Sequence, residues 1–282
     1  MIGSFQTGVS GLQVFQKDLE VIGNNIANVN TVGYKSSHME FQDALSASLV
    51  TGSNPMQVGT GVSTAAINTS YTGGPINPTG NTNDLAISGA GFFLLKDVSS
   101  NANYVTRDGQ LGLDGAGFVV TNSGMRVQGY TGPGPYTSAS PIGDIQINDA
   151  AAIAALNNTT SPAPSLVSYS IDSQGQVNAR MSDGTSGVIA QFVLQNFTNP
   201  QSLIKQGNNV YAFSPSAGPL AVAAAPTTGG LGQIYAGALE GSNVDLSVEM
   251  TSMITAQRAF EANAKIVTTT DEVLQDLVNL KR

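Results

Sequence analysis

The 282-residue sequence contains no cysteine and a single histidine, His38. Without cysteine the chain forms neither a disulfide framework nor a thiolate metal site, an absence found in both extracytoplasmic and cytosolic proteins. One histidine is too few for an HExxH zinc motif or a three-histidine metal site. The sequence also lacks the GxGxxG and GxxxxGK phosphate-binding loops. These absences argue against a metal enzyme and against nucleotide binding, so no cofactor and no catalytic residue are expected.

Charged residues are scarce as well. Asp, Glu, Lys and Arg make up 11% of the chain, less than half of the ~25% that is usual for soluble domains. The formal net charge is −8, and the 11 Lys and Arg residues are scattered. Binding to nucleic acid requires clustered cations that neutralise phosphates, so the charge pattern argues against a nucleic-acid partner.

Long apolar runs are also missing. No segment reaches the ~18 consecutive apolar residues of a membrane-spanning helix. The first twenty residues, "MIGSFQTGVSGLQVFQKDLE", lack both the basic region and the unbroken apolar run of a secretory signal. We therefore expect no membrane insertion. We also expect that any export of the protein from the cell proceeds without a cleaved signal peptide.

The sequence does contain an apolar heptad stripe near each end. In the N-terminal stripe, apolar residues recur at spacings of three and four: Leu12, Phe15, Leu19, Ile22, Ile26 and Val29. The C-terminal stripe, counted in the same way and interrupted by Gln257 and Asp271, contains Leu246, Met250, Met253, Phe260, Ala264, Val267, Leu274 and Val278. Such narrow stripes are typical of helices that pack on another helix. Either the two helices pack on each other, or each lies separately on the intervening domain, and the periodicity favours neither arrangement.

Between these helices the sequence predicts mostly antiparallel β-structure, which gives an α+β fold. Pairing of the two helices is the more economical arrangement, so we expect residues 1–30 and 243–282 to form a coiled-coil-like inner domain. An extended connector over 31–83 and a β-rich domain over 84–242 are looped out between the helices. Short strands in the β domain are separated by turn signals such as Asp108-Gly109 and Asp114-Gly115. The connector contains one short helical pattern, "MEFQDALSASL", and Ser242 is a candidate N-cap of the C-terminal helix.

Three asparagines, Asn24, Asn25 and Asn28, interrupt the N-terminal helix although asparagine is a poor helix former. At ~100° per residue they lie roughly opposite the apolar stripe. Amides donate and accept hydrogen bonds without net charge, so this polar face suits contacts between identical copies of the chain. The alternative is that the three amides face water and prepare the helix end before Gly33.

Other candidate sites have simpler explanations. Four aspartates suggest calcium binding or paired-carboxylate catalysis, but each lies next to or near glycine in a turn signal and none fits an EF-hand: Asp108, Asp114, Asp172 and Asp183. The heptad spacing of Met250 and Met253 favours packing over a ligand groove.

Several segments resemble the bacterial flagellar rod and hook proteins. The N-terminal "SGLQVFQKDLEVIGNNIANVNTVGYKSS" resembles the signature of that family, and "GALEGSNVDLSVEMTSMITAQRAFEANAKIVTTTDEVLQDLVNL" resembles its terminal helix. Between them, "NDLAISGAGFFLL" and "YVTRDGQLGLDGAGFVVTNSGMRVQGY" resemble its first β domain. Only residues 131–168 lack a clear counterpart.

The resemblance implies an axial protein of the flagellum, exported unfolded by the flagellar type III apparatus. Its terminal helices would form the inner tube of a helical homopolymer, which would contact other axial proteins at its junctions and an assembly cap. Within the family, "GALEGSNVDL" and "VNLKR" are most similar to the hook protein, so we expect a hook subunit that transmits torque as a universal joint.

Two alternatives remain at this stage. Residues 131–168 are too short for the outer β domain of typical hook subunits, which favours the distal rod (basal-body) protein. A secreted β-rich adhesin or binding module with helical ends is a more distant alternative.

Overall fold

The computed structural model describes residues 2–45, 47–51, 54–132, 134–137, 140–148, 165–218 and 223–280. Contacts divide the chain into two units. Unit 1 comprises residues 1–29, 35–70 and 244–282, and unit 2 comprises residues 30–34 and 71–243. The predicted connector, 31–83, is thus shared between the two units, and the three-part division made from the sequence stays a prediction.

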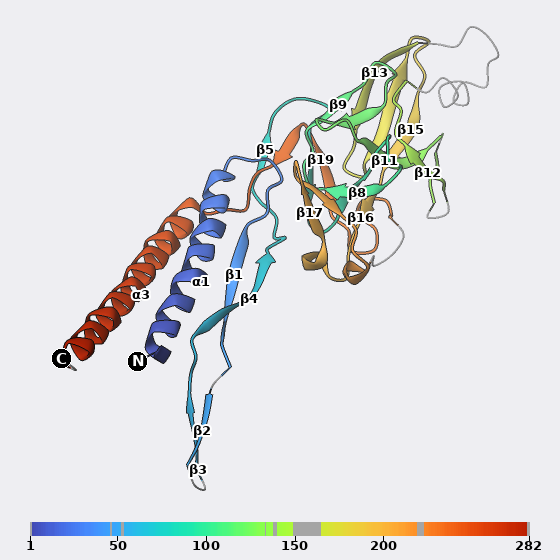
Figure 1. The fold of residues 1–282 in the computed structure, drawn as a ribbon. Helices are drawn as coiled ribbons and strands as arrows, with labels where there is room; N and C mark the ends of the chain where they lie inside the picture. Colours follow the sequence, from blue (N-terminus) through green and yellow to red (C-terminus); the bar gives the residue numbers. More distant parts are fainter. Residues whose placement is uncertain are drawn as a thin grey trace. The chain divides into compact units, whose positions relative to one another are not determined.

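Unit 1 contains the two terminal helices and two strand pairs (Figure 1). Helices α1 (Ile2–Ala27) and α3 (Leu246–Leu280) lie side by side. Strand β1 (Ser37–Asp43) pairs antiparallel with β4 (Val62–Thr69), and β2 (Ala47–Thr51) pairs antiparallel with β3 (Asn54–Val58). In the described residues, neither helix is long and apolar enough to cross a membrane.

The short helix expected within "MEFQDALSASL" is wrong, because its first five residues belong to β1. In this strand Ser37 and Met39 are buried while His38 and Glu40 are exposed. This alternation is the period of a half-buried strand. The ladder with β4 supplies its backbone hydrogen bonds, so cross-strand pairing outweighs the weak helical pattern.

Helix α3 begins at Leu246 because Asp245 caps it. Oδ1 of Asp245 accepts hydrogen bonds from the backbone N–H groups of Ser247 at 2.8 Å and Val248 at 3.3 Å. These two donors are among those that a helix start leaves without an intrahelical partner. The prediction that Ser242 is the N-cap is therefore wrong, since Ser242 lies buried before the helix begins.

Unit 2 is built around a twelve-stranded antiparallel sheet whose main path runs β13-β14-β15-β11-β7-β8-β18-β17. The pairs β19–β6 and β20–β5 lie outside this sheet. The strands are β5 (Ile76–Pro78), β6 (Leu85–Ser88), β7 (Phe92–Lys96), β8 (Asn103–Thr106), β9 (Leu111–Leu113), β10 (Val119–Thr121), β11 (Arg126–Thr131), β12 (Ile142–Asp144), β13 (Leu166–Ile171), β14 (Gln176–Met181), β15 (Ser186–Phe192), β16 (Leu194–Gln195), β17 (Ile204–Gly207), β18 (Val210–Ala212), β19 (Gln233–Ala236) and β20 (Ala238–Glu240), with 3-10 turns at Pro200–Ser202 and Pro215–Ala217.

The sheet of unit 2 is buried on both faces at its centre, whereas the outer strands β13 and β17 are largely exposed. Along β7, Phe93 and Leu95 belong to one hydrophobic cluster, whereas Phe92 and Leu94 belong to another. Successive side chains of a strand point to opposite faces of its sheet. A strand covered on both faces needs a continuous apolar run, which explains why "FFLL" does not alternate with polar residues.

The aspartate turn signals divide into two kinds. Asp114 lies in the hairpin between β9 and β10, as predicted, and its Oδ1 accepts the backbone N–H groups of Ala116 and Phe118. Asp108-Gly109 separates β8 from β9, as the turn signal predicts, but it does not form a hairpin, because β8 pairs with β7 and β18 whereas β9 pairs with β10. Gly109 is required there by close approach instead, since a Cβ atom would lie 1.6 Å from the carbonyl oxygen of Leu85.

Candidate functional site

The candidate site is the interface between α1 and α3 in unit 1, where two glycines allow close approach. A Cβ atom at Gly8 would lie 2.9 Å from Cγ2 of Val267, and one at Gly11 would lie 2.6 Å from Oδ1 of Asn263. The helices run antiparallel, because the start of α1 lies opposite the later turns of α3. Neither glycine was predicted from the sequence as a packing residue, although glycine in a helix interior costs stability and often marks close packing.

The predicted stripe residues occupy different environments in the single chain. On α1, Ile22 is buried, and four others are half-buried: Leu12, Phe15, Leu19 and Ile26. Val29, the last predicted member of this stripe, is half-buried but follows the end of α1 at Ala27. On α3, Met253, Phe260, Val267 and Leu274 are half-buried, whereas Leu246, Met250 and Val278 are exposed. Val14 and Ala256 are buried but were not predicted. The structure therefore places part of each stripe inside unit 1 and leaves the rest on its surface.

Asn25 connects three elements of unit 1 and is only 2% exposed. Its Nδ2 donates to the carbonyl oxygen of Ser37 at 2.7 Å and to Oε1 of Glu249 on α3 at 3.1 Å, and its Oδ1 accepts the N–H of Ser37 at 3.0 Å. A buried amide with both donor and acceptor groups in use holds its neighbours in a fixed arrangement. The interpretation of Asn25 as part of an exposed polar face is therefore wrong.

The other two asparagines of the predicted polar face differ from Asn25. Asn24 is exposed and Asn28 is half-buried. Nδ2 of Asn28 donates to the backbone oxygen of Asn24 at 2.9 Å and to its Oδ1 at 3.1 Å, close to the last residue of α1. Their contact with another copy of the chain stays a prediction.

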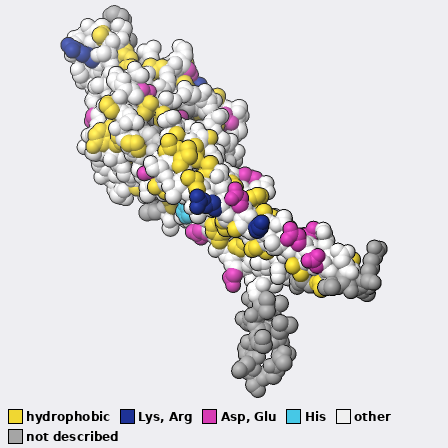
Figure 2. Space-filling model, turned by 90° about the vertical axis from the view of Figure 1, so that its left-hand side faces the viewer, with side chains coloured by type: hydrophobic (Ala, Val, Ile, Leu, Met, Phe, Trp, Pro, Cys, Tyr) yellow, Lys and Arg dark blue, Asp and Glu magenta, His cyan; other side chains and the backbone are white. Residues whose placement is uncertain are grey.

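Several large apolar side chains of α3 are exposed on the surface of unit 1. Figure 2, which faces the side of the molecule at the left of Figure 1, shows hydrophobic side chains among the charged ones along the helical unit. The exposed apolar residues of α3 are Leu246, Val248, Met250, Ile254, Ile266, Val273, Leu277 and Val278. Exposed apolar residues that gather on one element mark surfaces of interaction with other proteins.

Unit 2 contains a buried ion pair between Arg107 and Glu240. Nη1 of Arg107 lies 3.3 Å from Oε2 of Glu240, and the two side chains are 3% and 1% exposed. Nη2 of Arg107 donates to the carbonyl oxygen of Gly89 at 3.0 Å, and Oε1 of Glu240 accepts the N–H of Gly74 at 3.0 Å. Burial lowers the pKa of Arg107, whereas the adjacent Glu240 raises it. This pair joins "TRDG" and "GALEG", two sequence segments that resemble the rod and hook family.

Gly33 also packs against the two segments that contain Arg107 and Glu240. Its N–H donates to the backbone oxygen of Glu240 at 2.8 Å, and its φ of +68° is the left-handed conformation that favours glycine. A Cβ atom there would lie 2.8 Å from the backbone of Arg107 and Asp108. The sequence predicts a left-handed Gly33 correctly, but as the end of a helix that in fact ends at Ala27.

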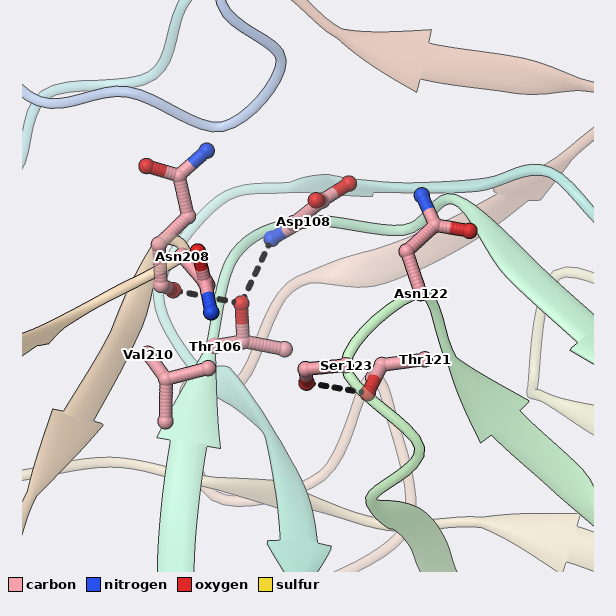
Figure 3. A pocket seen from close by; sticks show the side chains of 8 residues that line it. Thr106, Asp108, Thr121, Asn122, Ser123, Asn208 and Val210 are labelled. Carbon is pink, nitrogen blue, oxygen red and sulfur yellow. Dashed lines mark hydrogen bonds between the residues drawn. The ribbon is translucent and has the colours of Figure 1, made fainter.

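A small polar pocket in unit 2, of about 270 Å³, lies among turns (Figure 3). Oγ1 of Thr106 donates to the carbonyl oxygen of Asn209 at 2.7 Å and accepts the N–H of Asp108 at 3.0 Å. The hydroxyl groups of Thr121 and Ser123 are 2.9 Å apart. Burial raises the pKa of Asp108. The hydroxyl groups of this pocket thus serve the surrounding turns.

Comparison with known families gives three matches in chain order. The family "Flagella basal body rod protein" matches residues 5–35, "Flagellar hook protein FlgE/F/G D1 domain" matches residues 86–179, and "Flagellar basal body rod FlgEFG protein C-terminal" matches residues 235–280. The chain is also 40% identical, over the full length of both proteins, to the flagellar basal-body rod protein FlgG of Bacillus subtilis. This chain belongs to the flagellar rod and hook protein family.

Further relatives include both rod and hook proteins. The flagellar basal-body rod protein FlgG of Agrobacterium fabrum is 33% identical, with 94% of each chain covered. The flagellar hook protein FlgE of Salmonella typhimurium is 27% identical, with 99% of this chain and 100% of that protein covered, in an alignment of 412 positions. The protein is therefore a structural component of the bacterial flagellum and not an enzyme.

The expectation of a hook subunit is less well supported than the alternative of a rod subunit. The identity is higher with the rod protein, and the alignment with it spans 291 positions for a chain of 282 residues. Alignment with the hook protein needs 412 positions, so a large part of that protein has no counterpart here. The motifs "GALEGSNVDL" and "VNLKR" are therefore weaker evidence for a hook subunit than the short segment 131–168 is for a rod subunit.

Proposed function

We propose that this protein is a subunit of the distal rod of the flagellar basal body, and that it polymerises through its terminal helices. The full-length identity of 40% to a basal-body rod protein carries the assignment. The assembly mechanism rests on unit 1, in which α1 and α3 pack closely at Gly8 and Gly11 while much of the apolar surface of α3 stays exposed.

In this mechanism, incorporation into the growing rod completes the burial of the two apolar stripes as a coiled-coil-like layer. An isolated helix pair buries only part of its apolar surface, so unit 1 gains stability when neighbouring copies cover the rest. The chain leaves the cell through the flagellar type III export apparatus and adds at the tip beneath an assembly cap. Folding of the helices and polymerisation are then coupled, which disfavours association inside the cell.

The rod assignment is tested in the bacterium that encodes the protein. Antibody against unit 2 should label intact cells no more than a deletion strain, and should label the basal body once the membranes are stripped. Deletion of the gene should shorten the rod in isolated basal bodies. Labelling of a curved segment on intact cells, together with a complete rod in the deletion strain, would return the assignment to the hook.

A further inference from the structure

Unit 1 contains an apolar groove whose floor and walls come from α1, β1 and α3. Its volume is about 610 Å³. Phe15 and Phe41, whose ring centroids are 5.6 Å apart, lie at one side, and Val248 and Ala256 of α3 lie at the other. Phe41 is 44% exposed and Val248 59% exposed. Large apolar side chains therefore remain accessible in a concave surface.

The hydroxyl-bearing residues in the α3 wall do not make this groove a polar site. Oγ1 of Thr251 donates to the backbone oxygen of Ser247 at 2.8 Å, and Oγ1 of Thr255 donates to the backbone oxygen of Thr251 at 3.0 Å. Both hydroxyl groups are thus used within the helix, and their methyl groups remain for contact. Asp18 of α1 also lines the groove. The groove consequently suits a mainly apolar occupant.

The far end of α3 has an apolar surface that α1 does not cover. Residues 8, 11 and 25 of α1 lie opposite residues 267, 263 and 249 of α3. Both helices rise about 1.5 Å per residue, so Ile2, the first residue of α1, falls opposite about residue 273 of α3. Beyond that point α3 continues to Leu280. Leu277 and Val278 are 45% and 69% exposed.

This uncovered end continues the stripe that packs on α1. Val267 and Leu274 belong to the C-terminal stripe, and Val278 is its next member. The same kind of surface that packs on α1 within one chain therefore extends past the described start of α1. A second pair of helices is needed to bury it in the same way.

We propose that the groove receives the end of α3, residues 273–280, from a second copy of the chain. The eight-residue end is about 12 Å long and the α3 wall between Ser247 and Ala256 about 14 Å, so the lengths agree. The contact is heterologous when the copies are arranged head to tail, so that each copy receives the end of one neighbour and gives its own end to another. Such a contact leaves one free groove and one free end on every oligomer, so it repeats without closing. This inference rests on the proposed function and names the contact that propagates the polymer.

Introduced cysteines test the contact, because the natural chain has none. Val248→Cys places a thiol in the groove and Leu277→Cys places one on the end of α3. The two positions are 29 residues apart on one helix, about 44 Å, whereas a disulfide needs Cα atoms within about 7 Å. A disulfide between them therefore joins two copies. Ala262→Cys with Leu277→Cys is the matched control, because Ala262 is exposed on the same helix, does not line the groove and is not one of the large exposed apolar residues of α3.

Basal bodies are isolated from the source bacterium carrying each double variant, oxidised, and run on non-reducing gels. We expect a ladder of covalent oligomers from Val248→Cys with Leu277→Cys, and monomers from the control. Assembled protein that stays monomeric in both variants would overturn the groove assignment and leave the rod function intact. Dimers from Val248→Cys alone would also overturn it, since they would indicate a symmetric contact between two grooves.

A second measurement covers failure of the double variant to assemble. Val248→Lys and Leu277→Lys should each lower incorporation into basal bodies at least tenfold, whereas Ala262→Lys, at an exposed position of α3 outside the groove, should stay within twofold of the natural chain. Equal incorporation of all three variants would overturn the groove assignment. Absence of even the natural chain from isolated basal bodies would contradict the proposed function instead.

Discussion

Replacing Glu240 with Gln should destabilise unit 2 strongly, because Arg107 would keep its charge at a buried position without a counter-ion. Both side chains are at most 3% exposed. Removing one partner of such a buried pair typically costs about 3 to 5 kcal/mol. The amide oxygen of Gln still accepts the N–H of Gly74, so that hydrogen bond is retained in the variant.

Asp144→Asn supplies the matched control within the same unit. Oδ2 of Asp144 lies 2.9 Å from Nη1 of Arg126, but these side chains are 24% and 26% exposed. Solvent screens such a pair, so its loss should cost about 1 kcal/mol or less. Both substitutions replace a carboxylate with its amide. The difference between the two losses of stability therefore measures the effect of burying the ion pair.

Urea unfolding followed by tyrosine fluorescence is the appropriate assay. The chain has no tryptophan, and all 8 tyrosines fall within residues 30–34 and 71–243, so the signal reports unit 2. With a slope of about 2 kcal/mol per molar urea, Glu240→Gln should lower the midpoint by more than about 1 M, and Asp144→Asn by less than about 0.5 M. Equal midpoint shifts for the two variants would refute the assignment of a buried, structurally required pair.

Three further predictions concern the helices and the pH dependence. A chain lacking residues 1–30 and 243–282 should remain a soluble β monomer with a single cooperative urea transition, and loss of that transition would contradict a separately folding unit 2. Gly11→Leu should reduce incorporation into basal bodies by separating α1 from α3, whereas Gly23→Leu, where a Cβ atom meets nothing within 4 Å, should not. Burial raises the pKa of Asp144, but hydrogen bonds from Arg126 and Gln128 outweigh it and lower the pKa below its usual value. Its stabilisation is therefore present above about pH 3.9 and lost as the pH falls further, so acid titration of stability should be shallower in Asp144→Asn.

Sequence periodicity was sufficient to place the helices and most strands. Apolar heptads gave both terminal helices, and the runs around Phe93 and Val127 gave central strands of the sheet. The helix predicted at "MEFQDALSASL" does not form, because the conformation of this segment is decided by the pairing of β1 with β4, a strand far from β1 in the sequence. Local propensity carries no information about such non-local ladders.

The candidate site was predicted only in part. Asn25 was placed opposite the stripe together with Asn24 and Asn28, but at 100° per residue it lies about 60° from Ile22, beside the stripe. The chain after α1 returns along the helix as β1 and covers that side. Projection alone gives the side of a helix and not what packs there. Gly8 and Gly11, by contrast, carried a readable signal, since two glycines three residues apart in a strong helix pattern indicate a close neighbour.

Incorporation of an Ile22→Asp variant into isolated basal bodies tests most directly whether the paired terminal helices drive assembly. Ile22 is 5% exposed on α1, so the substitution buries an unpaired charge in unit 1. Val98→Asp, at a position that is 60% exposed in unit 2, is the control. We predict that the natural chain and Val98→Asp are incorporated equally, and that Ile22→Asp is absent although its tyrosine-monitored unfolding is unchanged. Incorporation of Ile22→Asp at the level of the natural chain would contradict assembly through these helices.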